Sequence, residues 1–77
     1  MSLAMTALID FLEPLPKDVY NYKQIDIEPL MLKNTSKALM IWYEGENRWI
    51  PFSVLRVDNL RHIWIANWFM EKERIYL

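Results

Sequence analysis

The first polar positions of the chain recur at the spacing of an α-helix and leave the rest of that surface apolar. They are Ser2, Thr6, Asp10 and Glu13. This pattern predicts an amphipathic helix within residues 1–13, with Ser2 as its N-cap. Pro14 and Pro16 end the helix, because proline has no amide donor and disfavours helical backbone at the residue before it.

Residues 14–23 hold two prolines, several turn formers and no helical period, which indicates an ordered linker on the surface. From Gln24 the pattern alternates. Ile25 and Ile27 fall on one face of a predicted strand, with polar residues between them. Pro29 interrupts this strand, and the next turn is expected at residues 34–36.

The clearest hairpin joins the apolar run 38–43 to residues 48–52. A two-residue loop at Glu44-Gly45 or Gly45-Glu46 places Met40 and Trp42 on the same face as Trp49. The opposite face then holds aliphatic and aromatic residues suited to a core, namely Leu39, Ile41, Ile50 and Phe52. The tryptophan face does not pack on this core, so something else must cover it.

A second hairpin is predicted from residues 53–57 and 60–65 around an Asp58-Asn59 turn. Its register places Val57 opposite Leu60 and Arg56 opposite Arg61. The last segment has apolar residues at helical spacing, so a short helix is expected over residues 66–74 with Asn67 as its cap.

Together these elements predict one domain over residues 1–77, mainly β with α+β as the alternative class. A small antiparallel sheet, formed within residues 24–65, is expected to curl into a partial barrel or roll. An N-terminal helix and a short C-terminal helix flank it.

The composition sharpens this interpretation. The chain has 77 residues, no cysteine and a formal net charge of −1, so its stability must come from packing and it has no general attraction for polyanions. Hydrophobic residues make up 53% of the chain, which is more than so small a core needs, and this favours a partner on part of the surface. With no bilayer-spanning run and no basic start typical of a signal peptide, we expect a cytoplasmic protein without a membrane partner.

From Ala38 onward the chain carries Trp49-Ile50-Pro51-x-Ser53 and, later, Trp64-x-Ala66-x-Trp68-Phe69-x-Glu71-Lys72. In these motifs it resembles small uncharacterised proteins carried by phages, prophages and plasmids. In those proteins a strand ending in Trp-Ile-Pro-x-Ser leads to a short C-terminal helix around a tryptophan. The resemblance implies the strand order and a mobile-element origin, and it supplies no catalytic residue. Phe52 departs from the pattern, which has a lysine at that position.

Catalytic groups are sparse in the sequence. Gly45 is the only glycine, which excludes Gly-rich phosphate loops, and His62 is the only histidine. A lone strand histidine is more often structural than a general base, and two carboxylates at Asp26 and Glu28 are too few for a cation site. We therefore expect no enzyme activity, no catalytic residue, no metal, no cofactor and no small-molecule substrate.

The leading hypothesis is a non-enzymatic interaction module that associates with itself or with another protein. The residues expected to form the contact are apolar and come from the first helix and the tryptophan face: Leu8, Phe11, Leu12, Met40, Trp42 and Trp49. The alternative is binding of single-stranded nucleic acid through bases stacked on aromatic rings beside cations. Its candidate residues are Lys37, Arg48, Trp49, Arg56, Arg61 and Trp64. A third interpretation makes the tryptophans a second hydrophobic layer closed by the terminal helix.

Overall fold

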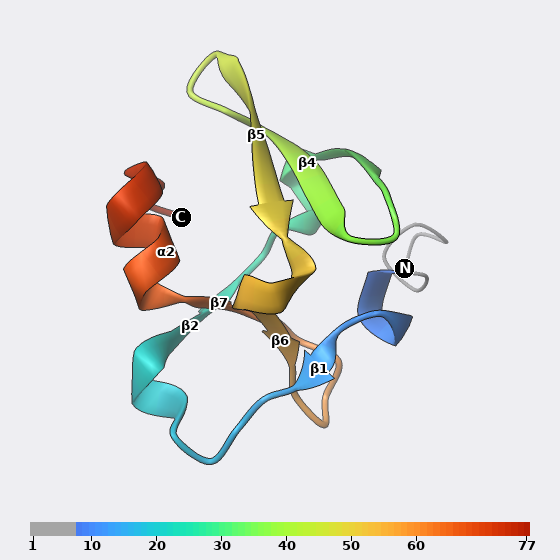
Figure 1. Ribbon diagram of the computed structural model, residues 1–77, viewed down its shortest axis with the longest axis vertical. Coiled ribbons are helices and arrows are strands. Elements are labelled where there is room, and N and C mark those ends of the chain that lie inside the picture. The colour runs from blue at the N-terminus through green and yellow to red at the C-terminus, as the bar shows by residue number, and fades with distance from the viewer. Residues whose placement is uncertain (1–7) are drawn as a thin grey trace.

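The computed structural model describes residues 8–77 and confirms a mainly β domain with α+β character. The strands form a four-stranded sheet in the order β1-β6-β7-β2 and a three-stranded sheet in the order β3-β4-β5 (Figure 1). The strands are β1 (Glu13–Pro14), β2 (Tyr22–Ile25), β3 (Met31–Asn34), β4 (Ala38–Tyr43), β5 (Glu46–Pro51), β6 (Leu55–Val57) and β7 (Ile63–Ala66). The sheets are not closed into a barrel, so the expected curling stops short of closure.

One aliphatic core joins the two sheets. Leu39, Ile41 and Ile50 enter it from the three-stranded sheet, and Leu55 and Ile65 enter it from the four-stranded sheet. The turn η3 (Phe52–Val54) carries the chain from one sheet to the other and buries both Phe52 and Val54. Alternation along β4 and β5 therefore sends one face inward and the other outward, as the sequence pattern predicts.

The first hairpin has the predicted two-residue loop. Tyr43 pairs with Glu46 and Leu39 with Ile50, which fixes Glu44-Gly45 as the loop. Both loop residues have positive φ, +48° at Glu44 and +82° at Gly45, as a type I′ turn requires.

The predicted register of the second hairpin is wrong. Arg56 pairs with Trp64, not Arg61, and Val57 pairs with Ile63, not Leu60. The loop is longer than a two-residue turn because the Asp58 carboxylate accepts hydrogen bonds from the amides of Leu60 and His62. This side-chain turn replaces the short turn suggested by the Asp-Asn pair.

The first segment is helical at residues 8–10 and then turns through i→i+3 hydrogen bonds from Phe11 and Leu12. The predicted end of the helix at residues 12–13 is therefore slightly late, and Glu13–Pro14 instead forms a short parallel strand with β6. The predicted beginning of the helix, with Ser2 as its cap, lies outside the described residues.

The terminal helix α2 (Asn67–Glu73) lies within the predicted bounds, but Asn67 is not its cap. Ala66 occupies the N-cap position, and the Asn67 side chain donates to the carbonyl of Tyr20. At the other end Arg74 adopts the left-handed conformation, and the amide of Ile75 donates to the carbonyl of Met70. These are the features of a Schellman motif, usually built with glycine at the left-handed position.

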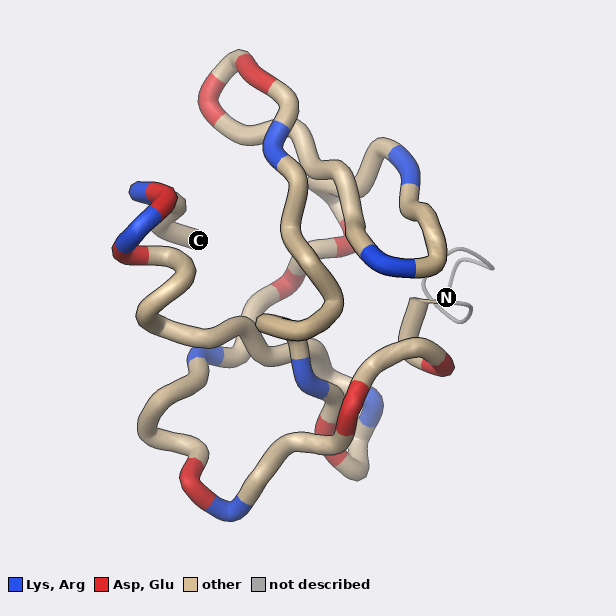
Figure 2. Tube along the Cα trace, viewed as in Figure 1, with Lys and Arg blue, Asp and Glu red and all other residues tan. Residues whose placement is uncertain are grey.

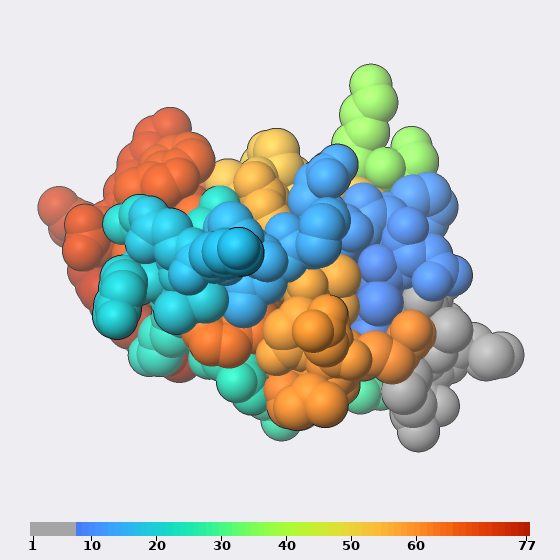
Figure 3. Space-filling view, turned by 90° about the horizontal axis from the view of Figure 1, so that it is seen from below, coloured from blue at the N-terminus to red at the C-terminus, as the bar shows by residue number. Residues whose placement is uncertain are grey.

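The predicted linker runs over the surface and contains Pro14 of β1, the turn η1 (Val19–Asn21) and the first two residues of β2. Seen from below, the segment between β1 and β2 lies across the face of the molecule (Figure 3). A further turn, η2 (Glu28–Leu30), holds Pro29 and separates β2 from β3. The strand ends at Ile25, before Pro29, so Ile27 is buried but lies outside the strand predicted for it. No helix within residues 8–77 has the length and apolar character needed to cross a bilayer.

Candidate functional site

The outer face of the three-stranded sheet carries an uncovered aromatic surface. Met40 pairs with Trp49 and Trp42 with Asn47, so these side chains share that face of β4 and β5. Trp42 and Trp49 are diagonal neighbours, about 7–8 Å apart at the backbone and within reach of each other's rings. Trp42 is 51% exposed and Trp49 is 46% exposed. Helix α2 packs on β7 of the other sheet, so the interpretation of these two tryptophans as a covered second layer is wrong.

An irregularity in β3 extends this surface. The register shifts between Met31 and Lys33, so Leu32 is an extra residue in the strand. Leu32 is 51% exposed, and the ammonium of Lys33 lies 5.8 Å from the centre of the Trp49 ring, a cation–π distance. Neither residue was predicted to belong to the site, because the pattern of residues 31–34 carries no signal for a bulge. We call Leu32, Lys33, Met40, Trp42 and Trp49 the outer tryptophan surface.

Of the three contact residues expected in the first segment, Leu8, Phe11 and Leu12, only Phe11 is exposed. Leu8 and Leu12 are buried in the protein's own core and do not reach the surface. Phe11 is half exposed and stacks on Phe52, with ring centres 5.9 Å apart. Leu8 and Leu12 therefore contribute to the core of the protein and not to a contact surface.

Arg48 points away from the outer tryptophan surface. It pairs with Ile41, whose side chain is in the core, and its guanidinium donates to the carbonyl of Glu73 at 2.8 Å. The same side chain forms an ion pair with Glu46 at 2.7 Å. Arg48 thus binds the last turn of α2, where a cation also interacts favourably with the helix dipole.

Arg56 and Trp64 face each other across β6 and β7 in the four-stranded sheet. The Arg56 guanidinium donates to the carbonyls of Ser53 and Leu55 and lies 5.5 Å from the centre of the Tyr22 ring. Both hydrogen bonds come from Nη1 of Arg56 and are made within the protein. Arg56 therefore has a structural role. It lies in the four-stranded sheet, whereas Trp49 lies in the three-stranded sheet.

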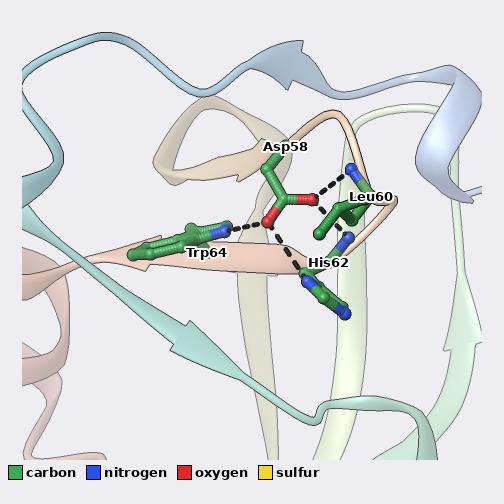
Figure 4. A network of polar contacts seen from close by, with 4 residues as sticks. All are labelled: Asp58, Leu60, His62 and Trp64. Atoms are coloured by element: carbon green, nitrogen blue, oxygen red, sulfur yellow. Dashed lines mark hydrogen bonds and ion pairs between the residues drawn. The ribbon is translucent and has the colours of Figure 1, made fainter.

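Asp58 is the centre of a polar network that the sequence analysis missed (Figure 4). Its Oδ2 accepts from the indole Nε1 of Trp64 at 2.9 Å and lies 3.2 Å from Nδ1 of His62. Its Oδ1 accepts from the amides of Leu60 and His62. Desolvation raises the pKa of Asp58, but the hydrogen bonds from Trp64, His62 and Leu60 and the nearby imidazole outweigh it and hold this pKa below 3.8.

The remaining nucleic-acid candidates lie in loops. Lys37 is in the β3–β4 turn and Arg61 is in the β6–β7 loop, both exposed. The six candidates therefore come from both sheets and their loops, and two of the arginines are engaged by carbonyl groups. Near Trp49, the tip of the β4–β5 hairpin carries Glu44 and Glu46, which are acidic (Figure 2).

A cavity of about 560 Å³ lies between the end of β2 and the β6–β7 loop. Its apolar side is formed by buried isoleucines, including Ile25 and Ile63, and its rim includes Arg61 and His62. In residues 8–77 no buried side-chain nitrogen or oxygen lacks a hydrogen-bond partner, and no group of acidic or histidine side chains has the arrangement of a metal site. The polar residues that line the cavity are exposed or partly exposed.

His62 contacts Asp58, and both belong to the loop that their hydrogen bonds shape. No hydroxyl group is bonded to the His62 ring in the described part of the chain. The geometry supports a structural role for this pair. Asp26, the other carboxylate considered, is exposed at the rim of the cavity.

Comparison with known proteins adds no further assignment. No protein-family model, no curated protein and no solved structure matches this chain. The resemblance to phage, prophage and plasmid proteins therefore stays a prediction from the motifs. The outer tryptophan surface is the candidate functional site that the geometry itself distinguishes.

Proposed function

We propose that this protein is a non-enzymatic interaction module that self-associates through the outer tryptophan surface. The observation that carries the proposal is the half exposure of Trp42 and Trp49, side by side on the outer face of β4 and β5. Indole side chains bury large areas at interfaces at low cost in conformational entropy, and tryptophan is enriched among the residues that dominate binding energy.

The surroundings of the surface favour a protein partner over a nucleic acid. Met40 lies opposite Trp49, and Leu32 adds further exposed apolar area on the bulged strand. Glu44 at the adjacent hairpin tip repels phosphate groups, whereas Glu46 lies on the opposite face of β5 and is paired with Arg48. A rim that carries both Lys33 and Glu44 suits a protein interface with an apolar centre and a polar rim.

The test is the oligomeric state measured by sedimentation velocity from about 5 to 500 µM, a range chosen for interfaces at the small end of the size scale. The wild-type protein is expected to shift from monomer to dimer within this range. Trp42→Ser combined with Trp49→Ser should stay monomeric, with a thermal midpoint close to that of the wild type because both rings are half exposed.

Trp68→Ser provides the matched control. Trp68 is 58% exposed on α2, so it undergoes the same chemical change away from the outer tryptophan surface. The control should retain association. A wild-type protein that remains monomeric at every concentration, or equal loss of association in Trp68→Ser, would contradict the proposal.

Single-stranded nucleic acid remains the second candidate, supported by the Lys33 ammonium over the Trp49 ring. A base stacked on Trp42 or Trp49 would have this cation near its phosphate. Quenching of tryptophan fluorescence by an oligothymidylate at low salt, lost steeply as salt is added and absent in Trp49→Ser, would favour this function instead.

A further inference from the structure

The β5 strand is an edge of the three-stranded sheet, and one hydrogen bond fixes which of its backbone groups face outward. The amide of Phe52 donates to the carbonyl of Lys37, which directly opposes it in the register of β4 and β5. In an antiparallel pair the hydrogen-bonded positions alternate. The amides of Arg48 and Ile50 therefore point to β4, and those of Asn47 and Trp49 point away from it.

The outward groups of β5 have no backbone hydrogen-bond partner within the described part of the chain. Apart from the β4 ladder, no backbone hydrogen bond in residues 8–77 involves Asn47 or Trp49. Pro51 is the next outward position and has no amide hydrogen, so the open segment ends there. The edge therefore offers two residues, Asn47 and Trp49, whose outward amide and carbonyl can both pair. Pairing ends at Pro51, which has no amide hydrogen.

We infer that a second copy of this chain adds to this edge, β5 against β5 in antiparallel orientation, with Asn47 of each copy opposite Trp49 of the other. This inference rests on the proposed function and specifies its contact. In this register both outward amides and both outward carbonyls of each copy are paired, giving four hydrogen bonds across a two-fold axis at Arg48. A shift of the register toward Pro51 leaves outward groups unpaired, because Pro51 cannot donate. A shift the other way places Trp49 opposite Gly45, which lies in the turn with φ +82° and not in the strand.

Two further observations favour a second copy as the occupant. Trp49 of one copy becomes a diagonal neighbour of Trp49 of the other, so the two outer tryptophan surfaces join into one sheet face. The two Arg48 side chains meet at the axis, but each carries its own Glu46 at 2.7 Å, and each Glu46 lies diagonal to the other copy's Arg48. The four charges sum to zero, so the pairing is electrically self-complementary.

Amide hydrogen exchange measured by NMR tests the inference on the unmodified protein. At low concentration Asn47 and Trp49 amides should exchange fast, while Arg48 and Ile50, already bonded to β4, serve as protected internal references. As dimer forms, protection of Asn47 and Trp49 should rise at least tenfold, with little change at the references. A mixed sample of labelled and unlabelled protein should show a contact between the α-protons of the two Arg48 residues.

Asn47→Pro tests the same contact by removing one outward amide from each copy. Proline is tolerated on an edge strand where its missing amide faces solvent, so the fold should survive, as circular dichroism would show. Dimerisation should be lost in this variant and retained in Asn47→Thr, which keeps the amide. If Asn47→Pro is unfolded, the exchange measurement decides the question.

The outcomes separate the two ideas. A dimer that depends on Trp42 and Trp49 but leaves the Asn47 and Trp49 amides unprotected overturns edge pairing and leaves the proposed function intact. A protein that stays monomeric overturns both. Binding of an oligonucleotide to the monomer, without protection of these amides, likewise contradicts the inference.

Discussion

Trp64 donates its indole Nε1–H to Oδ2 of Asp58 at 2.9 Å, joining strand β7 to the loop that precedes it. The same carboxylate accepts the amides of Leu60 and His62, so one side chain organises the whole turn. Asp58→Asn keeps the size of the side chain and removes its charge. We expect this substitution to lower the free energy of unfolding by about 1–2 kcal/mol, the usual cost of losing charge-assisted hydrogen bonds.

Chemical denaturation followed by fluorescence measures this change. Asp26→Asn is the matched control, since Asp26 is exposed and its substitution removes an equal charge. The two variants should differ clearly, with the control close to the wild type. Equal stability of Asp58→Asn and Asp26→Asn would show that the network contributes nothing to the fold.

The lowered pKa of Asp58 gives a pH dependence with a definite sign. Because the folded-state pKa lies below the unfolded value of 3.8, the unfolded chain binds the proton more tightly. The stability from this group is fully present above the unfolded pKa and is lost as pH falls through the lower folded value. Thermal unfolding from pH 6 down to pH 2 should therefore show an acid-dependent loss that is reduced in Asp58→Asn. An identical pH profile in wild type and variant would contradict the assignment.

Arg48 is expected to stabilise helix α2 from the neighbouring sheet, through its bond to the Glu73 carbonyl. Arg48→Met removes this bond while keeping a long apolar stem, and it should cost about 1–2 kcal/mol of stability and weaken hydrogen-exchange protection in α2. Glu46→Gln removes only the exposed ion-pair partner, so it should cost about 0–1 kcal/mol. Greater loss in Glu46→Gln than in Arg48→Met would reverse this interpretation.

The backbone of the β4–β5 turn is strained at Glu44, whose φ is +48°. A residue that tolerates positive φ would relieve this strain. Left-handed backbone costs most side chains about 1–2 kcal/mol, and asparagine tolerates it best after glycine. Glu44→Asn should therefore raise the thermal midpoint. Glu44→Gln removes the same charge without favouring the left-handed conformation, so an equal rise in that control would assign the effect to charge instead.

The sequence pattern predicts the first hairpin well because its evidence is redundant. A two-residue loop beside Gly45 and the separation of aliphatic from tryptophan residues both fix which residues share a face, and of the two loops left open the structure has Glu44-Gly45. The sequence pattern fails at the second hairpin, where Asp58 and Asn59 match a short turn but the Asp58 side chain stabilises a longer loop. That outcome depends on Trp64, which supplies a hydrogen bond from a later strand.

The sequence predicts the tryptophans of the candidate site, but it does not predict the residues at the rim of the site. Met40, Trp42 and Trp49 follow from alternation, whereas Leu32 joins them only because β3 is bulged. Arg48 sits next to Trp49 in the sequence but on the opposite face of the strand, so its partner is a helix terminus that no local pattern reveals. Contacts between distant segments thus decide which neighbours in sequence share a surface.

The bulge in β3 has a consequence for how far such assembly can proceed. An irregular strand carrying Lys33 is a poor template for another chain, so growth from the β3 edge of the three-stranded sheet is disfavoured. Pairing through β5 alone is symmetric and uses up the open margin of both molecules. Association through the three-stranded sheet would therefore stop at two chains, because its β5 edge is used in the pair and its β3 edge is irregular.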